Sequence, residues 1–216
     1  MIGNPSTPLL METTDAELAG DLALRAGSDA LIVFAHGSGS SRNSDRNRQV
    51  AADLQGAGFC TLLFDLLTEE EARIDEQTAE YRFDVPLIGR RLTDVLDWLA
   101  RAGETETLEI GLFGASTGAA AALLAAAERP RRISAIVSRG GRPDLAMGVL
   151  GRVEAPTLLI VGERDEEVIR LNEVARSHIR AACELEIVPG ASHLFEEPGA
   201  LDHVAVVAAG WFQRHM

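Results

Sequence analysis

The sequence contains no lysine. Its 20 basic residues are all arginine, which excludes a P-loop lysine, a Schiff-base lysine and a lysine general base. Because acidic residues number 33, the formal net charge is −13 at pH 7. Nucleic acids and anionic membrane surfaces both require a basic face on the protein that binds them. We therefore expect neither as a partner.

Cysteine is scarce as well, with only Cys60 and Cys183, and neither belongs to a C-x-x-C pair. Nothing in this spacing indicates a disulfide framework, which favours a reducing compartment. The segment 1–18 lacks the charged and apolar regions of a signal peptide. These observations predict a cytoplasmic protein.

Signals for metals and membranes are also missing. There is no H-E-x-x-H motif, and His178, His203 and His215 lie on helix-like patterns where a surface role is the default. The longest weakly polar run, 107–128, includes serine, threonine and glycine and changes its periodicity midway. We interpret it as a strand followed by a buried helix, not as a membrane span. No metal or cofactor is expected.

What the sequence does contain is an alternation of strand-like apolar runs with helix-like segments. This pattern predicts βαβ units, a mainly parallel sheet and a single α/β domain over 1–216, with ligands bound beyond the carboxyl ends of the strands. The expected strands are 8–14, 17–26, 30–36, 60–66, 108–113, 132–138, 156–162 and 184–190, and the expected helices are 44–57, 86–103, 117–128, 167–180 and 200–214.

A G-x-S-x-G motif stands where one strand is expected to meet a helix. It consists of Gly114, Ser116 and Gly118 with their neighbours. A nucleophile on such a tight turn needs small residues two positions before and two after it, because larger side chains would collide with the adjacent strand or helix. The alternative is a glycine-rich turn with an N-capping serine. The motif predicts a nucleophilic hydroxyl above the sheet edge.

A serine hydroxyl needs a base, and the base needs an orienting acid. In this type of fold the chain order is serine, acid, histidine. Asp165 follows the strand 156–162, and His193 follows the last strand. We expect Ser116, His193 and Asp165 to form a catalytic triad, with Glu163 as the alternative acid.

The loop HGSGSS, which follows the strand 30–36, predicts an oxyanion hole. Its glycines allow a substrate to approach the backbone, and we expect the N–H groups of Ser38 and Thr117 to be the donors. His36 is expected to brace this loop and is a candidate substrate contact. The alternative is a loop that binds the phosphates of a dinucleotide. However, the third glycine of that motif is missing, and Asp65 lies further along the chain than the acidic residue that would bind the ribose.

Three arginines are further candidates for contacts with the substrate. Arg139 and Arg142 follow a strand at the active edge and can hold a carboxylate or phosphate; the alternative is an ion pair with Asp144 or with the acidic loop. Arg42 lies just past the oxyanion loop and either lines the pocket or ties the loop down. The acidic segment 68–76 is either a mobile flap or a solvated surface turn.

These motifs resemble the α/β-hydrolase superfamily, specifically its small dienelactone-hydrolase-like members. The matching blocks are HGSGSS, GASTG, GERD and GASHLF, and the resemblance covers about 17–214. Other blocks, such as SRGGRPDLA, are similar to a subgroup that is sometimes joined to phosphoribosyltransferase domains. The resemblance implies an eight-stranded, mostly parallel sheet flanked by helices, a metal-free Ser-His-Asp esterase mechanism, and well-separated strands for the two cysteines. Dienelactone hydrolases proper use a cysteine where this chain has Ser116, which favours a plain carboxylic ester.

The expected function is therefore hydrolysis of a small-molecule ester through an acyl-enzyme on Ser116. The connections between the expected elements are too short for a separate cap domain, which predicts an open, shallow pocket and short acyl chains. The same residues suit a lactone hydrolase, a thioesterase or a perhydrolase, and a non-catalytic binding module is the alternative of another class. The helix 200–214 is expected to pack on the core or to form a homodimer contact.

Overall fold

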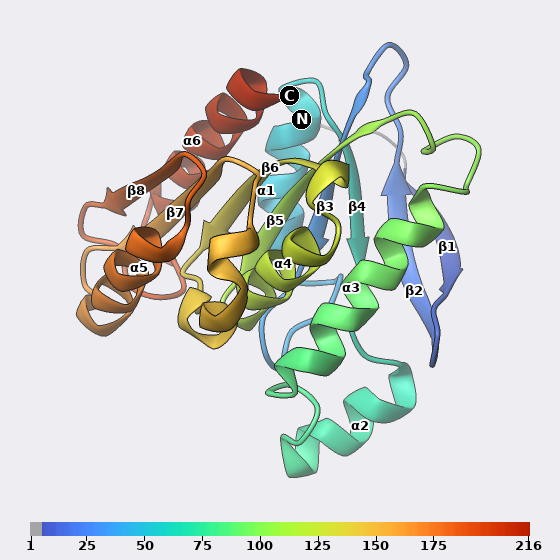
Figure 1. Ribbon diagram of the computed structural model, residues 1–216, viewed down its shortest axis with the longest axis horizontal. Coiled ribbons are helices and arrows are strands. Elements are labelled where there is room, and N and C mark those ends of the chain that lie inside the picture. The colour runs from blue at the N-terminus through green and yellow to red at the C-terminus, as the bar shows by residue number, and fades with distance from the viewer. Residues whose placement is uncertain (1–5) are drawn as a thin grey trace.

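Figure 1 shows the architecture of the chain, a sheet with helices on both faces. The computed structural model describes residues 6–216. Residues 1–5 lie outside the described residues. They belong both to the predicted domain and to the segment 1–18, in which no signal peptide is expected. Among the described helices, none combines the length and apolarity needed to cross a membrane.

The sheet has eight strands in the order β1-β2-β4-β3-β5-β6-β7-β8. β1 pairs antiparallel with β2, β2 pairs antiparallel with β4, and the remaining pairs are parallel. The predicted eight-stranded, mostly parallel sheet is therefore confirmed. Its strands are β1 (Thr7–Glu12), β2 (Glu17–Ala23), β3 (Ala30–Ala35), β4 (Cys60–Phe64), β5 (Glu109–Ala115), β6 (Ile133–Arg139), β7 (Thr157–Gly162) and β8 (Cys183–Val188).

Helices cover both faces of the sheet (Figure 1). α1 and α6 pack together on one face, and α3, α4 and α5 cover the other, where a 3₁₀ segment (Pro143–Arg152) packs between α4 and α5. The helices are α1 (Asp45–Gly56), α2 (Glu69–Thr78), α3 (Val85–Leu99), α4 (Thr117–Glu128), α5 (Glu166–His178) and α6 (Ala200–His215).

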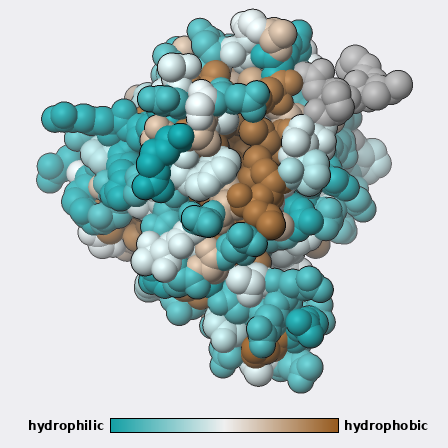
Figure 2. Space-filling model, turned by 90° about the vertical axis from the view of Figure 1, so that its right-hand side faces the viewer, coloured by the Kyte–Doolittle hydropathy of each residue, from teal (hydrophilic) through white to brown (hydrophobic). Residues whose placement is uncertain are grey.

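The central strands are apolar along their whole length because they are covered on both sides. Every residue of β3 is buried, as is every residue of β7. The edge strand β1 differs, since Leu10 is 58% exposed. Figure 2 faces the side of the molecule that carries β1 and shows an apolar stripe among hydrophilic surroundings. The free cysteines lie on β4 and β8, which four other strands separate, as the resemblance implied.

The segment 68–76 is not a surface turn: residues 69–76 belong to a helix, α2, and Thr68 is its N-cap. Thr68 accepts a hydrogen bond from the N–H of Glu71, and the Glu71 carboxylate accepts one from the N–H of Thr68. This reciprocal capping box follows a T-x-x-E pattern that is visible in the sequence. The buried Arg91 of α3 donates two hydrogen bonds to Glu71 and lowers the pKa of that carboxyl. α2 therefore projects beyond the sheet as an anchored lobe (Figures 1 and 2).

Candidate active site

The turn between β5 and α4 is very tight and holds Ser116 at φ 52° and ψ −120°. Such a conformation is strained for a residue other than glycine. A Cβ added at Gly114 would lie 2.4 Å from the Cα of Ala119, and one added at Gly118 would lie 2.2 Å from the carbonyl oxygen of Ala35. Small residues at both positions thus allow the turn, as the sequence pattern predicts.

The hydroxyl of Ser116 does not cap the helix that it precedes. α4 begins at Thr117, and its N-cap residue Ser116 makes no side-chain capping hydrogen bond. The side chain is partly exposed at the carboxyl edge of the sheet. An N-capping role therefore fails to explain a serine at this position.

His193 and Asp165 are paired beside this turn. The carboxylate of Asp165 accepts a hydrogen bond from Nδ1 of His193 at 2.6 Å, which leaves Nε2 as the nitrogen available to a hydroxyl. Glu163, the alternative acid, instead accepts a hydrogen bond from the N–H of Gly190 at 2.7 Å. The carboxylate that orients the histidine is thus that of Asp165.

The end of β6 lies between the serine turn and the histidine loop. The N–H of Ser116 donates to the carbonyl of Arg139 at 3.1 Å. A Cβ added at Gly140 would lie 3.1 Å from the carbonyl oxygen of His193. The three strand-following loops that carry Ser116, Asp165 and His193 thus meet at one edge of the sheet.

The two expected oxyanion donors lie next to each other. The hydroxyls of Ser38 and Thr117 are 2.9 Å apart, and Ser38 Oγ donates to the carbonyl of Arg82 at 3.1 Å. Because Ser38 has one hydroxyl proton, Thr117 is the donor in the pair. Within residues 6–216 the N–H groups of Ser38 and Thr117 have no protein acceptor. Gly37 brings this loop close to Ser116, since an added Cβ would lie 3.0 Å from Ser116 Cβ.

The turn after α2 supports the same loop from the other side. The carboxylate of Asp75 accepts hydrogen bonds from the backbone N–H groups of Tyr81 and Arg82 and from Nε of Arg82. Burial acts to raise the pKa of Asp75, but these hydrogen bonds outweigh it and lower the pKa. The Arg82 carbonyl that receives the Ser38 hydroxyl is thereby fixed. The sequence signals neither this link nor the hydroxyl pair, because both depend on side-chain directions.

His36 braces the oxyanion loop with both ring nitrogens. Nδ1 donates to the carbonyl of Gly37 at 2.9 Å, and Nε2 accepts from the N–H of Leu66 at 3.0 Å. Burial lowers the pKa of His36, although the Gly37 hydrogen bond and the charge of Asp65 act in the opposite direction. With both nitrogens bound to backbone, His36 has no polar atom to offer a substrate, so the bracing role is the one that the geometry favours.

Lowering the pH from about 7 to about 5 should destabilise the wild type more than His36→Gln. The folded-state pKa lies below the ordinary value of 6.5, so the unfolded chain takes up the proton first as the pH falls through that value. Stability is then lost with a slope of at most about 1.4 kcal/mol per pH unit. Glutamine offers an acceptor to Leu66 but does not titrate. Urea unfolding of both proteins across this range measures the difference, and parallel curves would refute it.

Two of the three candidate arginines are committed to partners within the protein. Arg42 pairs with Asp65 through its backbone N–H and guanidinium, and its Nε lies 3.5 Å from Asp21. Arg142 makes a bidentate pair with Asp144, with both distances 2.8 Å. The ion-pair alternative for Arg142 is therefore the one that the structure favours. Arg42 ties the loop to Asp65, just after β4, and also lines the cleft described below.

Arg139 differs from these two arginines. As a residue it is 8% exposed, its Nη1 is buried without a hydrogen-bond partner, and no ion pair to its guanidinium is found in the described part of the chain. Burial, together with the neighbouring charge of Arg46, lowers the pKa of Arg139 to about 10. Its guanidinium carbon lies 6.0 Å from the ring centre of Phe195. A buried cation without a counter-charge is costly to keep.

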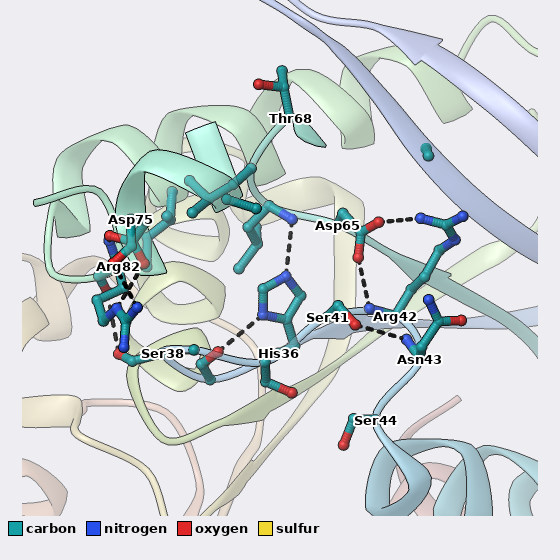
Figure 3. Close-up of a pocket in the computed structure, with 18 of the residues that line it drawn as sticks. His36, Ser38, Ser41, Arg42, Asn43, Ser44, Asp65, Thr68, Asp75 and Arg82 are labelled. Atoms are coloured by element: carbon teal, nitrogen blue, oxygen red, sulfur yellow. Dashed lines mark hydrogen bonds and ion pairs between the residues drawn. The ribbon is translucent and has the colours of Figure 1, made fainter. Parts of the chain in front are cut away.

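A cleft of about 1110 Å³ opens beside the oxyanion loop (Figure 3). The loop after β3 forms one wall and α2 forms another. Ser38 and Thr117 line the cleft, whereas Ser116, Asp165 and His193 do not. Polar side chains such as Glu69 and Glu76 alternate in its lining with apolar ones such as Leu67 and Ile88. Over residues 6–216, no group of three or more His, Cys, Asp or Glu residues has an arrangement that could hold a metal ion.

The eight-stranded sheet, the serine at a sharp strand-to-helix turn and the histidine–aspartate pair are the features of an α/β hydrolase. The family of alpha/beta hydrolase domains matches residues 28–205, and the chain belongs to it. Within that family it is dienelactone-hydrolase-like. The crystal structure of a dienelactone hydrolase from Anabaena variabilis is 51% identical, covers 98% of each chain and gives a TM-score of 0.96.

Two other similarities are informative. A protein from Mycobacterium tuberculosis (strain H37Rv), provisionally named a phosphoribosyl transferase, is 55% identical over 199 residues. The match covers 92% of this chain and 44% of that protein, so the chain spans less than half the length of the curated relatives it matches. An esterase from Pyrococcus furiosus shares the fold at 20% identity, with a TM-score of 0.75 over 98% of this chain and 93% of that one.

Proposed function

We propose that this chain is a serine hydrolase that cleaves small carboxylic esters. Ser116 attacks the ester carbonyl, and His193 takes the serine proton and returns it to the leaving alcohol. Asp165 holds the histidine in the tautomer that does this. The N–H groups of Ser38 and Thr117 stabilise the oxyanion of the tetrahedral intermediate, and water then cleaves the acyl-enzyme.

The observation that carries this proposal is the conformation of Ser116. Ser116 is held at φ 52°, and the glycines two positions before and after it have no room for a side chain. This strained conformation costs folding free energy. The hydroxyl makes no capping hydrogen bond that would offset the cost. The 2.6 Å contact between His193 and Asp165 beside it supplies the base that such a serine needs.

Short acyl chains suit this cleft better than long ones. Burying a long apolar chain against carboxylates such as Glu69 and Glu76 would desolvate them, and neither has a partner among the described residues. A lactone, a thioester or a perester reacts through the same three residues and remains within the proposed class. We assign the phosphoribosyl-transferase name of the Mycobacterium relatives to the part of those proteins that this chain does not span.

A fluorophosphonate probe tests the proposal directly, because it reacts with an activated serine and not with an ordinary hydroxyl. We expect the wild type to take up one probe per chain, and peptide mass mapping to place it on Ser116. Pre-incubation of the wild type with the probe should abolish its turnover of p-nitrophenyl butyrate. A folded wild type that neither reacts nor turns over the ester would instead favour a non-catalytic binding module.

A further inference from the structure

Arg139 is a buried cation without a counter-charge at the edge of the sheet where the proposed chemistry takes place. Its Nη1 is buried without a hydrogen-bond partner in the described part of the chain. Phe195 is near the outer limit of a cation–π contact, at 6.0 Å. Since removing an unpaired charge from water is strongly unfavourable, folding alone gives no reason to keep an arginine there.

The position of Arg139 links it to both reacting groups. Its carbonyl accepts the N–H of Ser116 at 3.1 Å, and the next residue, Gly140, lies against His193. Ala135 and Val137 alternate with Arg139 along β6 and are buried on the face that α1 and α6 cover. The guanidinium is therefore on the α1 side of the serine turn.

A second cation lies at the start of α1, a helix of 12 residues. Arg46 pairs through Nη1 at 3.2 Å with the exposed Glu196, which follows Phe195, the residue whose ring centre lies 6.0 Å from the guanidinium carbon of Arg139. The Nε of Arg46 is buried and has no partner within residues 6–216. Glu196 is a counter-charge for Arg46, but among the described residues Arg139 has none.

We propose that Arg139 and Arg46 bind an oxyanion carried by the ester substrate, either a carboxylate or a phosphoryl group. This inference rests on the proposed function, because it names the class of ester that Ser116 cleaves: an acidic half-ester whose free anion sits beside β6. The bound anion supplies the counter-charge that Arg139 lacks and positions the ester carbonyl over Ser116. Arg142, on the same loop, has its own carboxylate in Asp144 and takes no part.

Matched substrates test the proposal. We compare kcat/KM for p-nitrophenyl butyrate, the mono-p-nitrophenyl ester of succinic acid, and p-nitrophenyl 3-phosphonopropionate, in wild type, Arg139→Met and the control Arg142→Met. The wild type should prefer at least one anionic ester, and the preferred one distinguishes carboxylate from phosphoryl. Arg139→Met should reduce the anionic-to-neutral ratio by about 10- to 100-fold, while Arg142→Met keeps the wild-type ratio.

Ligand-induced shifts in Tm give a readout that does not depend on turnover. Succinate or inorganic phosphate should raise the Tm of the wild type but not that of Arg139→Met. Without ligand, Arg139→Met should melt about 2–4 °C higher than the wild type, because the variant removes an unpaired buried charge. A lower Tm for Arg139→Met, with all three esters slowed equally, would make Arg139 a structural support for Phe195 and overturn the proposal.

The two proposals fail in different ways. A wild type that hydrolyses the neutral ester through Ser116, but has no preference for either anionic ester and no Tm response to the anions, overturns only the anion site. A wild type without turnover or probe uptake overturns the esterase, while a Tm response that Arg139→Met abolishes still supports the anion site.

Discussion

Replacing Ser116 with alanine should reduce kcat/KM for p-nitrophenyl butyrate by about 10⁴- to 10⁶-fold, because no other group at the site can form the acyl-enzyme. The residual rate then comes only from substrate binding and the oxyanion donors. Steady-state kinetics on purified protein measures the loss, and covalent probe uptake should disappear with it. A variant that kept more than about a tenth of the wild-type rate would rule out Ser116 as the nucleophile.

The same variant should fold as well as the wild type. Alanine at φ 52° has the same backbone strain as serine, and the Ser116 hydroxyl makes no capping hydrogen bond that would be lost. We expect the free energy of unfolding to change by less than about 0.5 kcal/mol. Ser138→Ala is the matched control, since Ser138 is the last residue but one of the neighbouring strand β6, lies opposite Gly114 and is fully buried. That variant should keep both activity and stability.

The strands of the sheet and the loops that carry the candidate site follow from local patterns, whereas the number of strands was implied only by the resemblance. Apolar runs of strand length mark the central strands, and the polar residues after them mark the active edge, so the positions of Ser116 and His193 at that edge are predictable from the chain. The glycines of the serine turn are predictable for the same reason, because the steric requirement is local.

What the sequence leaves open depends on which side chains meet. The sequence does not distinguish Arg139 from Arg142, because both follow the same strand. In the structure Arg142 pairs with Asp144, whereas Arg139 is buried without a counter-charge among the described residues. Asp165 and Glu163 are likewise both acids after the same strand, and only the loop geometry brings Asp165 to His193. α2 is the exception, since its T-x-x-E capping box is a local signal that was available in the sequence.

Gly118→Ala should destabilise the protein by about 3 kcal/mol or more. Gly118 lies in the first turn of α4, where its backbone approaches the end of β3. An added Cβ would lie 2.2 Å from the carbonyl oxygen of Ala35 and 2.5 Å from that of His36. Neither backbone oxygen can move without disturbing the parallel pairing of β3 with β5 or the oxyanion loop, so the overlap must be relieved by shifting α4 and, with it, Ser116.

Glycine to alanine at position 210 should instead raise the free energy of unfolding. Gly210 lies inside α6, and nothing stands within 4 Å of the position that its Cβ would occupy. Alanine there stabilises a helix by about 1 kcal/mol relative to glycine, which corresponds to a Tm increase of roughly 2–4 °C for a chain of this size. Urea unfolding and ester hydrolysis of the two variants separate packing from helix propensity: Gly210→Ala should keep full activity, whereas Gly118→Ala should lose activity even at temperatures where it remains folded. Equal stability of the two variants would contradict this prediction. It would mean that the serine turn can accommodate a Cβ at position 118, so that close packing is not the reason for glycine there.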